Sequence, residues 1–209
     1  SMIIRALTQG SADRLCGIYA IINSLTRVVG RFTRDEQEWI FSYLIDRMFK
    51  NRPKEQRKFS PGVMLTCGIR TRRLPKLLAA CIGTNGVKLH KHCKGHLSDA
   101  HRDILKKVGS AKHTINGSPS ESSHFEPIED FFRNHPRGVI IFRWINKKSD
   151  LDHWTVCTGL SKTFFSLFDS IDRKKIYRKN VTFLMRERDA AGASDFILIS
   201  SINYVFRSE

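Results

Sequence analysis

The sequence predicts an α+β fold in a single domain of 209 residues, with helices first and an antiparallel sheet second. Two observations lead to this expectation. Apolar residues recur at helical spacing from about residue 14 to about residue 135, and β-branched and aromatic residues form short runs from about 138 to 206. Helices followed by strands, without alternation between them, are typical of α+β proteins.

The first two helices have clear start or stop signals. Apolar residues at 18, 21, 22, 25, 28 and 29 predict a buried helix over Cys16–Val29, and Gly30 follows where such a helix ends. Thr33 and Glu36 have the spacing of a capping box, which predicts a second helix to about Phe49. Polar and basic residues 50–59 are expected to form a loop.

The middle of the chain carries weaker helix signals separated by turns. The expected helices are Ser60 to about Cys67, Arg70–Ile82 with Pro75 near its start, Ser98–Val108 and Glu126–Asn134. Gly83–Gly86 reads as a turn, and the polar residues 109–123 read as a loop.

Five segments near the C-terminus are strand candidates, namely Val139–Trp144, His153–Leu160, Phe164–Phe168, Phe196–Ile199 and Ile202–Phe206. The turn around residue 161 predicts that the second and third of them form a hairpin. Each of His153 and Asp169 is eight residues from that turn, so the two are expected to meet at the open end of the hairpin.

Composition and charge exclude several classes of protein. With 41% apolar residues the chain can bury a core, which excludes a disordered protein. No apolar run approaches the length of a membrane-spanning helix, and no secretory signal is visible, so we expect a cytoplasmic protein, with secretion as an effector left open. Five scattered Cys residues favour reduced thiols over a disulfide framework.

The net charge of +16 is concentrated in the middle of the chain, where residues 61–120 carry +9. Such a field attracts acidic partners, so a protein or peptide substrate of acidic character is expected. A nucleic acid is less favoured because no nucleic-acid-binding motif accompanies the charge. The oligomeric state leaves no signature in the sequence.

The residues at the start of the first helix point to thiol chemistry. Cys16 follows a polar loop and opens a buried helix, and a helix N-terminus favours the thiolate, which is the nucleophilic form. Gln9, seven residues earlier, could donate its amide to a developing oxyanion together with the backbone N–H of Cys16.

The hairpin offers the partners that a thiol nucleophile needs. His153 could accept the proton of the thiol and later protonate the leaving group. Asp169 could accept a hydrogen bond from the histidine and orient it. Asp13 and Asp152 are alternative acidic partners, but alternation along the strand places Asp152 on the opposite face from His153.

This arrangement resembles the papain-like cysteine peptidases, in which Gln, Cys-Gly at a helix start, His-Trp on a strand and Asp or Asn on the next strand follow in this order. The segment from Gln9 to Gly17, with Ala20 and Asn23, is most similar to the bacterial peptidases that cleave double-glycine leaders from bacteriocins. The resemblance implies a papain-like fold in which Cys16 is the nucleophile, His153 the base, Asp169 the orienting group and Gln9 the oxyanion donor.

The leading functional hypothesis is therefore a cysteine peptidase or isopeptidase that needs no metal or organic cofactor. A side-chain amide deamidase or transglutaminase would use the same triad, and a basic binding module that has lost catalysis is the alternative from another class. Nothing in the sequence separates the peptidase from the first alternative, because the acyl-enzyme step is common to both.

Other reactive side chains are interpreted as structural. Cys67, Cys81 and Cys157 lie in apolar surroundings and are expected in the core. The segment His90–His96 with His101 carries zinc-type ligands, but it lacks a recognised metal-binding spacing and contains several Lys residues, so we expect a basic loop.

Overall fold

The computed structural model describes residues 15–50, 69–114, 122–149, 151–171, 173–185, 189, 193 and 195–208. Its helices are α1 (Cys16–Val29), α2 (Arg34–Lys50), α4 (Leu74–Ala79), α5 (Gly86–His92), α6 (Asp99–Lys106) and α7 (Ser122–Asn134), with 3-10 turns η2 (Gly83–Asn85), η3 (Arg178–Asn180) and η5 (Ile199–Ser201). Its strands are β1 (Val108–Lys112), β2 (Val139–Asn146), β3 (Leu151–Leu160), β4 (Phe164–Leu167), β5 (Lys175–Tyr177), β6 (Thr182–Leu184), β7 (Asp195–Leu198) and β8 (Asn203–Arg207).

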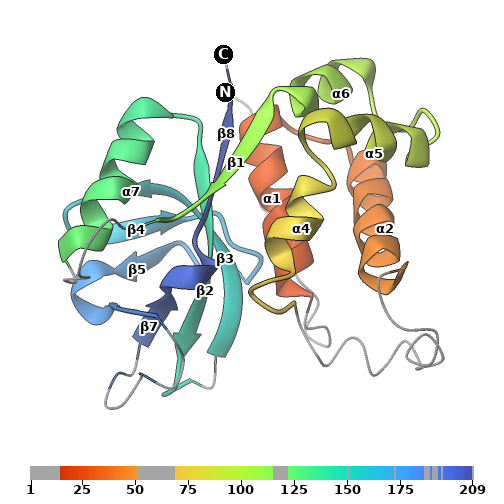
Figure 1. The fold of residues 1–209 in the computed structure, drawn as a ribbon. Helices are drawn as coiled ribbons and strands as arrows, with labels where there is room; N and C mark the ends of the chain where they lie inside the picture. The colour runs from red at the N-terminus through yellow and green to blue at the C-terminus, as the bar shows by residue number, and fades with distance from the viewer. Residues whose placement is uncertain are drawn as a thin grey trace.

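The fold is α+β, as the sequence predicts. Figure 1 shows one group of helices beside the sheet, with α1 between the strands and the remaining helices of that group. The eight strands form one sheet in the order β1-β8-β2-β3-β4-β5, and β7 joins it through β2. All these pairs are antiparallel, but β6 pairs with β7 in parallel, so the expectation of an antiparallel sheet is correct except at this edge.

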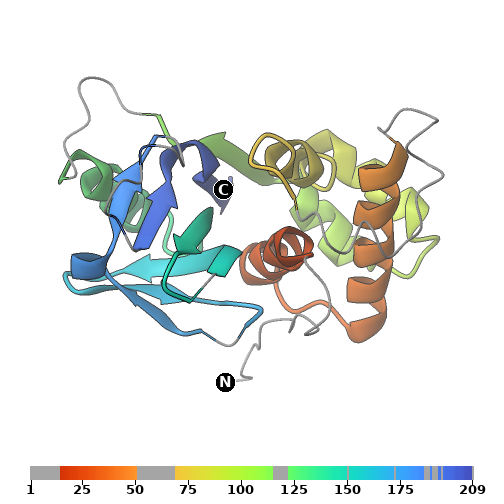
Figure 2. The same ribbon diagram turned by 90° about the horizontal axis from the view of Figure 1, so that it is seen from below.

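Helix α1 is the centre of the molecule. Ile18, Ile21, Ile22 and Leu25 are fully buried, and the helix packs against β3 and β2 on one side and α2 on the other. Figure 2 shows α1 nearly end-on between the sheet and α2. The helix ends at Gly30, as predicted from the sequence. Gly30 has a φ of 127°, a positive value that favours glycine.

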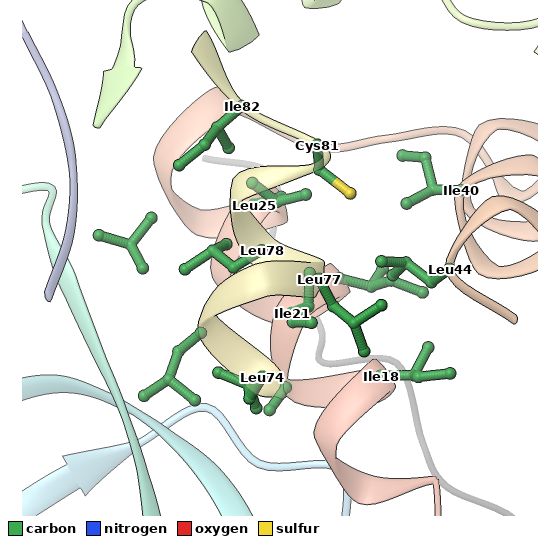
Figure 3. Packing of buried hydrophobic residues seen from close by; sticks show 14 of the residues in the cluster. Ile18, Ile21, Leu25, Ile40, Leu44, Leu74, Leu77, Leu78, Cys81 and Ile82 are labelled. Atoms are coloured by element: carbon green, nitrogen blue, oxygen red, sulfur yellow. The ribbon is translucent and has the colours of Figure 1, made fainter. Parts of the chain in front are cut away.

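A single core joins the helices to one face of the sheet. Val139 and Ile141 of β2 and Trp154 and Val156 of β3 share a cluster with the apolar residues of α1, α2 and α4. Figure 3 shows part of this packing, with Ile18 of α1 near Leu74 of α4 at one end of the cluster and Ile82 at the other. The opposite face of the sheet packs against α7 through a second cluster that contains Ile128, Ile140 and Phe142.

Two parts of the helical prediction are corrected. Residues 109–123 were expected to be a loop, but Val108–Lys112 is strand β1, which pairs with β8 at one end of the strand order. The helices were expected to occupy residues 14–135 as one group, yet β1 belongs to the sheet and α7 packs on the sheet's far face (Figure 1). The short segment Val-Gly-Ser-Ala-Lys has little strand character of its own, and its partner is far away in sequence.

In the middle of the chain, the helix boundaries differ from those predicted from the sequence. Residues 70–73 form a turn, and α4 begins at Leu74 with Pro75 in its first turn, where the missing N–H of proline costs nothing. The segment around His90 is helix α5 rather than a loop, because Leu89 and Cys93 are four residues apart and both are fully buried. The expected helix from Ser60 to Cys67 lies outside the described residues.

The predicted hairpin is present, and the sheet contains two short strands, β5 and β6, that the sequence did not reveal. Strand β3 turns at Ser161, whose hydroxyl accepts hydrogen bonds from the N–H groups of Thr163 and Phe164. Strand β4 then pairs with β5, and β6 pairs with β7. Strands β5 and β6 have three residues each, too few to show an alternating pattern.

Candidate active site

Cys16 is the first residue of α1 and is nearly buried, with 7% of its surface exposed. Leu15 caps the helix without a side-chain hydrogen bond, and the first turn contains no acidic residue. The positive end of the helix dipole therefore acts on the Cys16 thiol without compensation from a carboxylate of that turn.

His153 of β3 and Asp169, two residues beyond β4, are also buried and form an imidazole–carboxylate pair. The Nε2 atom of His153 lies 2.5 Å from Oδ1 of Asp169. The Cys16 side chain lies beside the imidazole of His153 and acts on it electrostatically. Because Asp169 occupies Nε2, Nδ1 is the ring nitrogen left for the thiol. The three residues thus follow one another in the order Cys16, His153 and Asp169, from α1 through β3 to the segment after β4.

Asp169 is held by more than the histidine. The hydroxyl of Thr155 donates to Oδ2 of Asp169 at 2.8 Å, and the N–H of Ile171 donates to Oδ1 at 3.3 Å. Thr155 is buried and lies two residues after His153 on the same face of β3. The sequence reasoning missed Thr155, although its position at i+2 from His153 was the available signal.

The register of the hairpin explains how Asp169 reaches both residues. Leu160 pairs with Phe165 and Gly159 with Ser166, but Cys157 pairs with Leu167, so Thr158 is bulged. The hydrogen bond from the N–H of Phe168 to the carbonyl of Val156 continues this shifted register. Asp169 is therefore displaced toward Thr155 and bonds His153 diagonally, whereas the sequence prediction placed the two directly opposite each other.

The electrostatic surroundings favour a charged imidazole at His153. Burial by itself lowers the pKa of His153, but the hydrogen bonds and charges of Asp169 and Cys16 outweigh it and raise the pKa from 6.5 to about 9. A histidine that keeps its proton at neutral pH beside a thiol stabilises the thiolate. The site can therefore hold a thiolate–imidazolium pair, the reactive state of a cysteine nucleophile.

The backbone around Ile69 completes the site. An added Cβ at Gly17 would lie 3.0 Å from Cβ of Ile69, so the absence of a side chain at Gly17 lets Ile69 approach the start of α1. The indole N–H of Trp154 donates to the carbonyl of Ile69 at 2.8 Å. Trp154 lies in the helix-side core, and its hydrogen bond fixes this segment.

The other sequence candidates are placed as follows. Gln9 and Asp13 lie outside the described residues, as does Cys67. Asp152 pairs with Arg143 through Oδ1 at 2.6 Å on the exposed side of β3, away from the series just described. Cys81 and Cys157 are fully buried, as expected, and burial raises the pKa of both thiols, that of Cys157 to about 12.

Two of the histidines between 90 and 101, His96 and His101, are bonded to acidic side chains. Nδ1 of His101 lies 2.7 Å from Oε1 of Glu36, and Nδ1 of His96 lies 2.6 Å from Oδ2 of Asp35. Glu36 also accepts from the N–H groups of Thr33 and Ser98, so it closes the predicted capping box and joins α6 to α2. Within the described ranges, no group of three or more His, Cys, Asp and Glu residues is placed to hold a metal ion.

Comparisons with known proteins give no independent assignment, because no family model, curated protein or solved structure matches the chain. In the described part of the chain, no helix combines the length and the apolar content needed to cross a membrane. The geometry itself can support nucleophilic attack by Cys16, proton transfer by His153 and orientation of His153 by Asp169.

Proposed function

We propose that this chain is a cysteine peptidase or isopeptidase of the papain-like class. The observation that carries the proposal is the position of His153 between Cys16 and Asp169, with a hydrogen bond to Asp169 and a pKa raised to about 9 by both neighbours against the opposing effect of burial. A structural histidine needs no thiol at its second ring nitrogen, whereas a general base for a cysteine nucleophile does. The location of the thiol at the start of a buried helix adds further support.

The proposed reaction proceeds through an acyl-enzyme. The Cys16 thiolate attacks the carbonyl carbon and forms a C–S bond, and the oxyanion is stabilised by backbone N–H groups of the first turn of α1, with Gln9 as the predicted second donor. His153 transfers its proton to the departing amine. It then accepts a proton from water, which attacks the acyl carbon and releases Cys16 as the thiolate.

The proposal is tested by limited alkylation of the purified protein with iodoacetamide between pH 5 and pH 9, read by peptide mass spectrometry. Cys16 should react fastest on the acidic side if His153 activates it as proposed, and this advantage should disappear in His153→Ala. The buried Cys81, Cys93 and Cys157 are internal controls. If Cys16 reacts no faster than these thiols, or is unaffected by the His153 substitution, the proposal is wrong.

A further inference from the structure

The segment that begins at Ile69 borders the candidate active site from a third direction. The side chain of Ile69 packs on Gly17, which follows Cys16. The carbonyl of Ile69 accepts a hydrogen bond from the indole N–H of Trp154, which follows His153. Ile69 is therefore locked between the two elements that carry the thiol and the imidazole. The residues that come next along the chain must leave the site from this position.

Those next residues turn directly into α4. The N–H groups of Arg73 and Leu74 donate to the carbonyl of Arg70 at 2.8 and 3.4 Å, and the Arg73 side chain bonds to the carbonyl of Met48. In Figure 3, Leu74 at the start of α4 lies near Ile18 of the first turn of α1. The turn 70–73 is thus anchored at the end of α1 that bears Cys16.

Two arginines on this turn are available to a ligand. Arg70 and Arg72 are exposed, and no carboxylate of the described residues forms an ion pair with either. Residues 69–114 contain eleven Lys and Arg but only Asp99 and Asp103 as acids. Both acids are already paired, Asp99 with Arg102, and Asp103 with Arg102 and Lys106. The positive charge beside the site is therefore not neutralised locally.

We propose that Arg70 and Arg72 form a carboxylate-recognition edge of the active site, so that the substrate is a polypeptide with Asp or Glu close to the bond that is cleaved. This inference rests on the proposed function and specifies its substrate class. Guanidinium groups bind carboxylates through paired N–H donors, and their always-charged state steers acidic ligands toward the thiol. The turn that carries both arginines follows directly from Ile69, which packs against Gly17 at the start of α1.

The test uses tripeptide vinyl sulfones, which alkylate a reactive cysteine, with Glu, Gln or Lys placed at each position in turn of an otherwise alanine peptide. The rate of Cys16 labelling should be highest for one Glu probe, by about fivefold to tenfold over its Gln analogue at low salt, and the preference should shrink at high salt. Arg70→Gln with Arg72→Gln should remove the preference, while Arg70→Lys with Arg72→Lys should retain part of it.

Lys91→Gln is the matched control, since Lys91 is an exposed cation of α5, which lies at the other end of the helical group from the start of α4 (Figure 1). It should leave the Glu preference intact. Equal labelling by Glu, Gln and Lys probes, or a preference that survives removal of both arginines, overturns the carboxylate edge. The proposed function is judged separately by the iodoacetamide profile of Cys16, so a reactive Cys16 without a Glu preference refutes this inference alone.

Binding of single-stranded oligonucleotides is the other outcome that the basic surface allows. If an oligonucleotide blocks labelling by every probe and the block depends on Arg70 and Arg72, the two arginines serve a nucleic acid and the proposal is wrong. If the oligonucleotide still blocks labelling in the variant with both Gln substitutions, these arginines do not bind the nucleic acid. The preference for Glu probes then decides whether the carboxylate edge exists.

Discussion

Two regions of the molecule bring together a cysteine, a histidine and a carboxylate, yet only one has the arrangement of a catalytic site. At the first, His153 stands between Cys16 and Asp169. At the second, Glu36 bonds His101, and the charges of Glu36 and Asp35 act directly on Cys93.

The electrostatic consequences are opposite. At Cys93, burial raises the pKa of the thiol and the two nearby carboxylates raise it further, to about 11. At the first region, the charges of Asp169 and Cys16 raise the pKa of His153, so a positive charge is kept beside the thiol. The comparison teaches that the order of the three residue types matters. A histidine between the thiol and the carboxylate favours the thiolate, whereas a carboxylate that acts directly on the thiol disfavours it.

The largest expected effect on hydrolysis comes from comparing the replacement of Cys16 with the replacement of Cys93. Cys16→Ala should abolish hydrolysis of a mixture of internally quenched fluorescent peptides, because loss of the nucleophile in such enzymes costs several orders of magnitude. Cys93→Ala should leave hydrolysis unchanged and slightly lower the melting temperature, since it removes a fully buried side chain. Retained hydrolysis in Cys16→Ala would assign the chemistry elsewhere.

The next largest effect is on the pKa of His153 and compares replacement of Asp169 with replacement of Glu36. It is measured by NMR titration of the histidine rings. Asp169→Asn should lower the pKa of His153 from about 9 toward 6.5, because the main charge that favours the imidazolium is gone. A raised histidine pKa stabilises the fold fully below pH 6.5, and this contribution is lost as the pH rises through about 9. The fall in stability between about pH 6.5 and about pH 9 should therefore be much smaller in the variant.

Glu36→Gln is the control for that titration. It should leave the pKa of His153 where it is, since Glu36 bonds His101 and the N–H groups of Thr33 and Ser98 instead. Its effect should be a loss of stability of about 1–3 kcal/mol, the usual range for disturbing a buried hydrogen-bonded carboxylate. A wild-type His153 that titrates near 6.5 would contradict the triad geometry.

The smallest effect sharpens the role of Thr155. Thr155→Val removes the hydrogen bond to Oδ2 of Asp169 while keeping the shape of the side chain. We expect a loss of peptide hydrolysis of about tenfold, from an Asp169 that no longer orients His153 well, and a stability loss of roughly 1 kcal/mol. Thr155→Ser keeps the hydroxyl and should restore hydrolysis.

A stability loss in Thr155→Val without a change in hydrolysis, or a Thr155→Ser variant that behaves like Thr155→Val, would show that the threonine only packs. Together the two substitutions separate positioning of Asp169 from filling of the core.

Local signals in the sequence were sufficient where neighbouring residues decide the structure. The limits of α1 follow from its apolar spacing and from Gly30, and the start of α2 follows from the reciprocal hydrogen bonds of Thr33 and Glu36. Cys16, His153 and Asp169 were identified because a helix start and a hairpin restrict where their side chains lie. Counting residues from the turn predicted that His153 and Asp169 meet. They do so because Asp169, shifted by the bulge at Thr158, bonds His153 diagonally.

What the sequence by itself determined about this protein is its α+β class, its central helix and the three candidate catalytic residues. Only the tertiary structure revealed that β1 pairs with β8, that Thr155 holds Asp169, and that Ile69 lies between Gly17 and Trp154. The physical reason is separation along the chain. A helix cap or a hairpin brings near neighbours together, whereas the contacts of Ile69 with Gly17 and Trp154 join segments 52 and 85 residues apart, and no local pattern records such contacts.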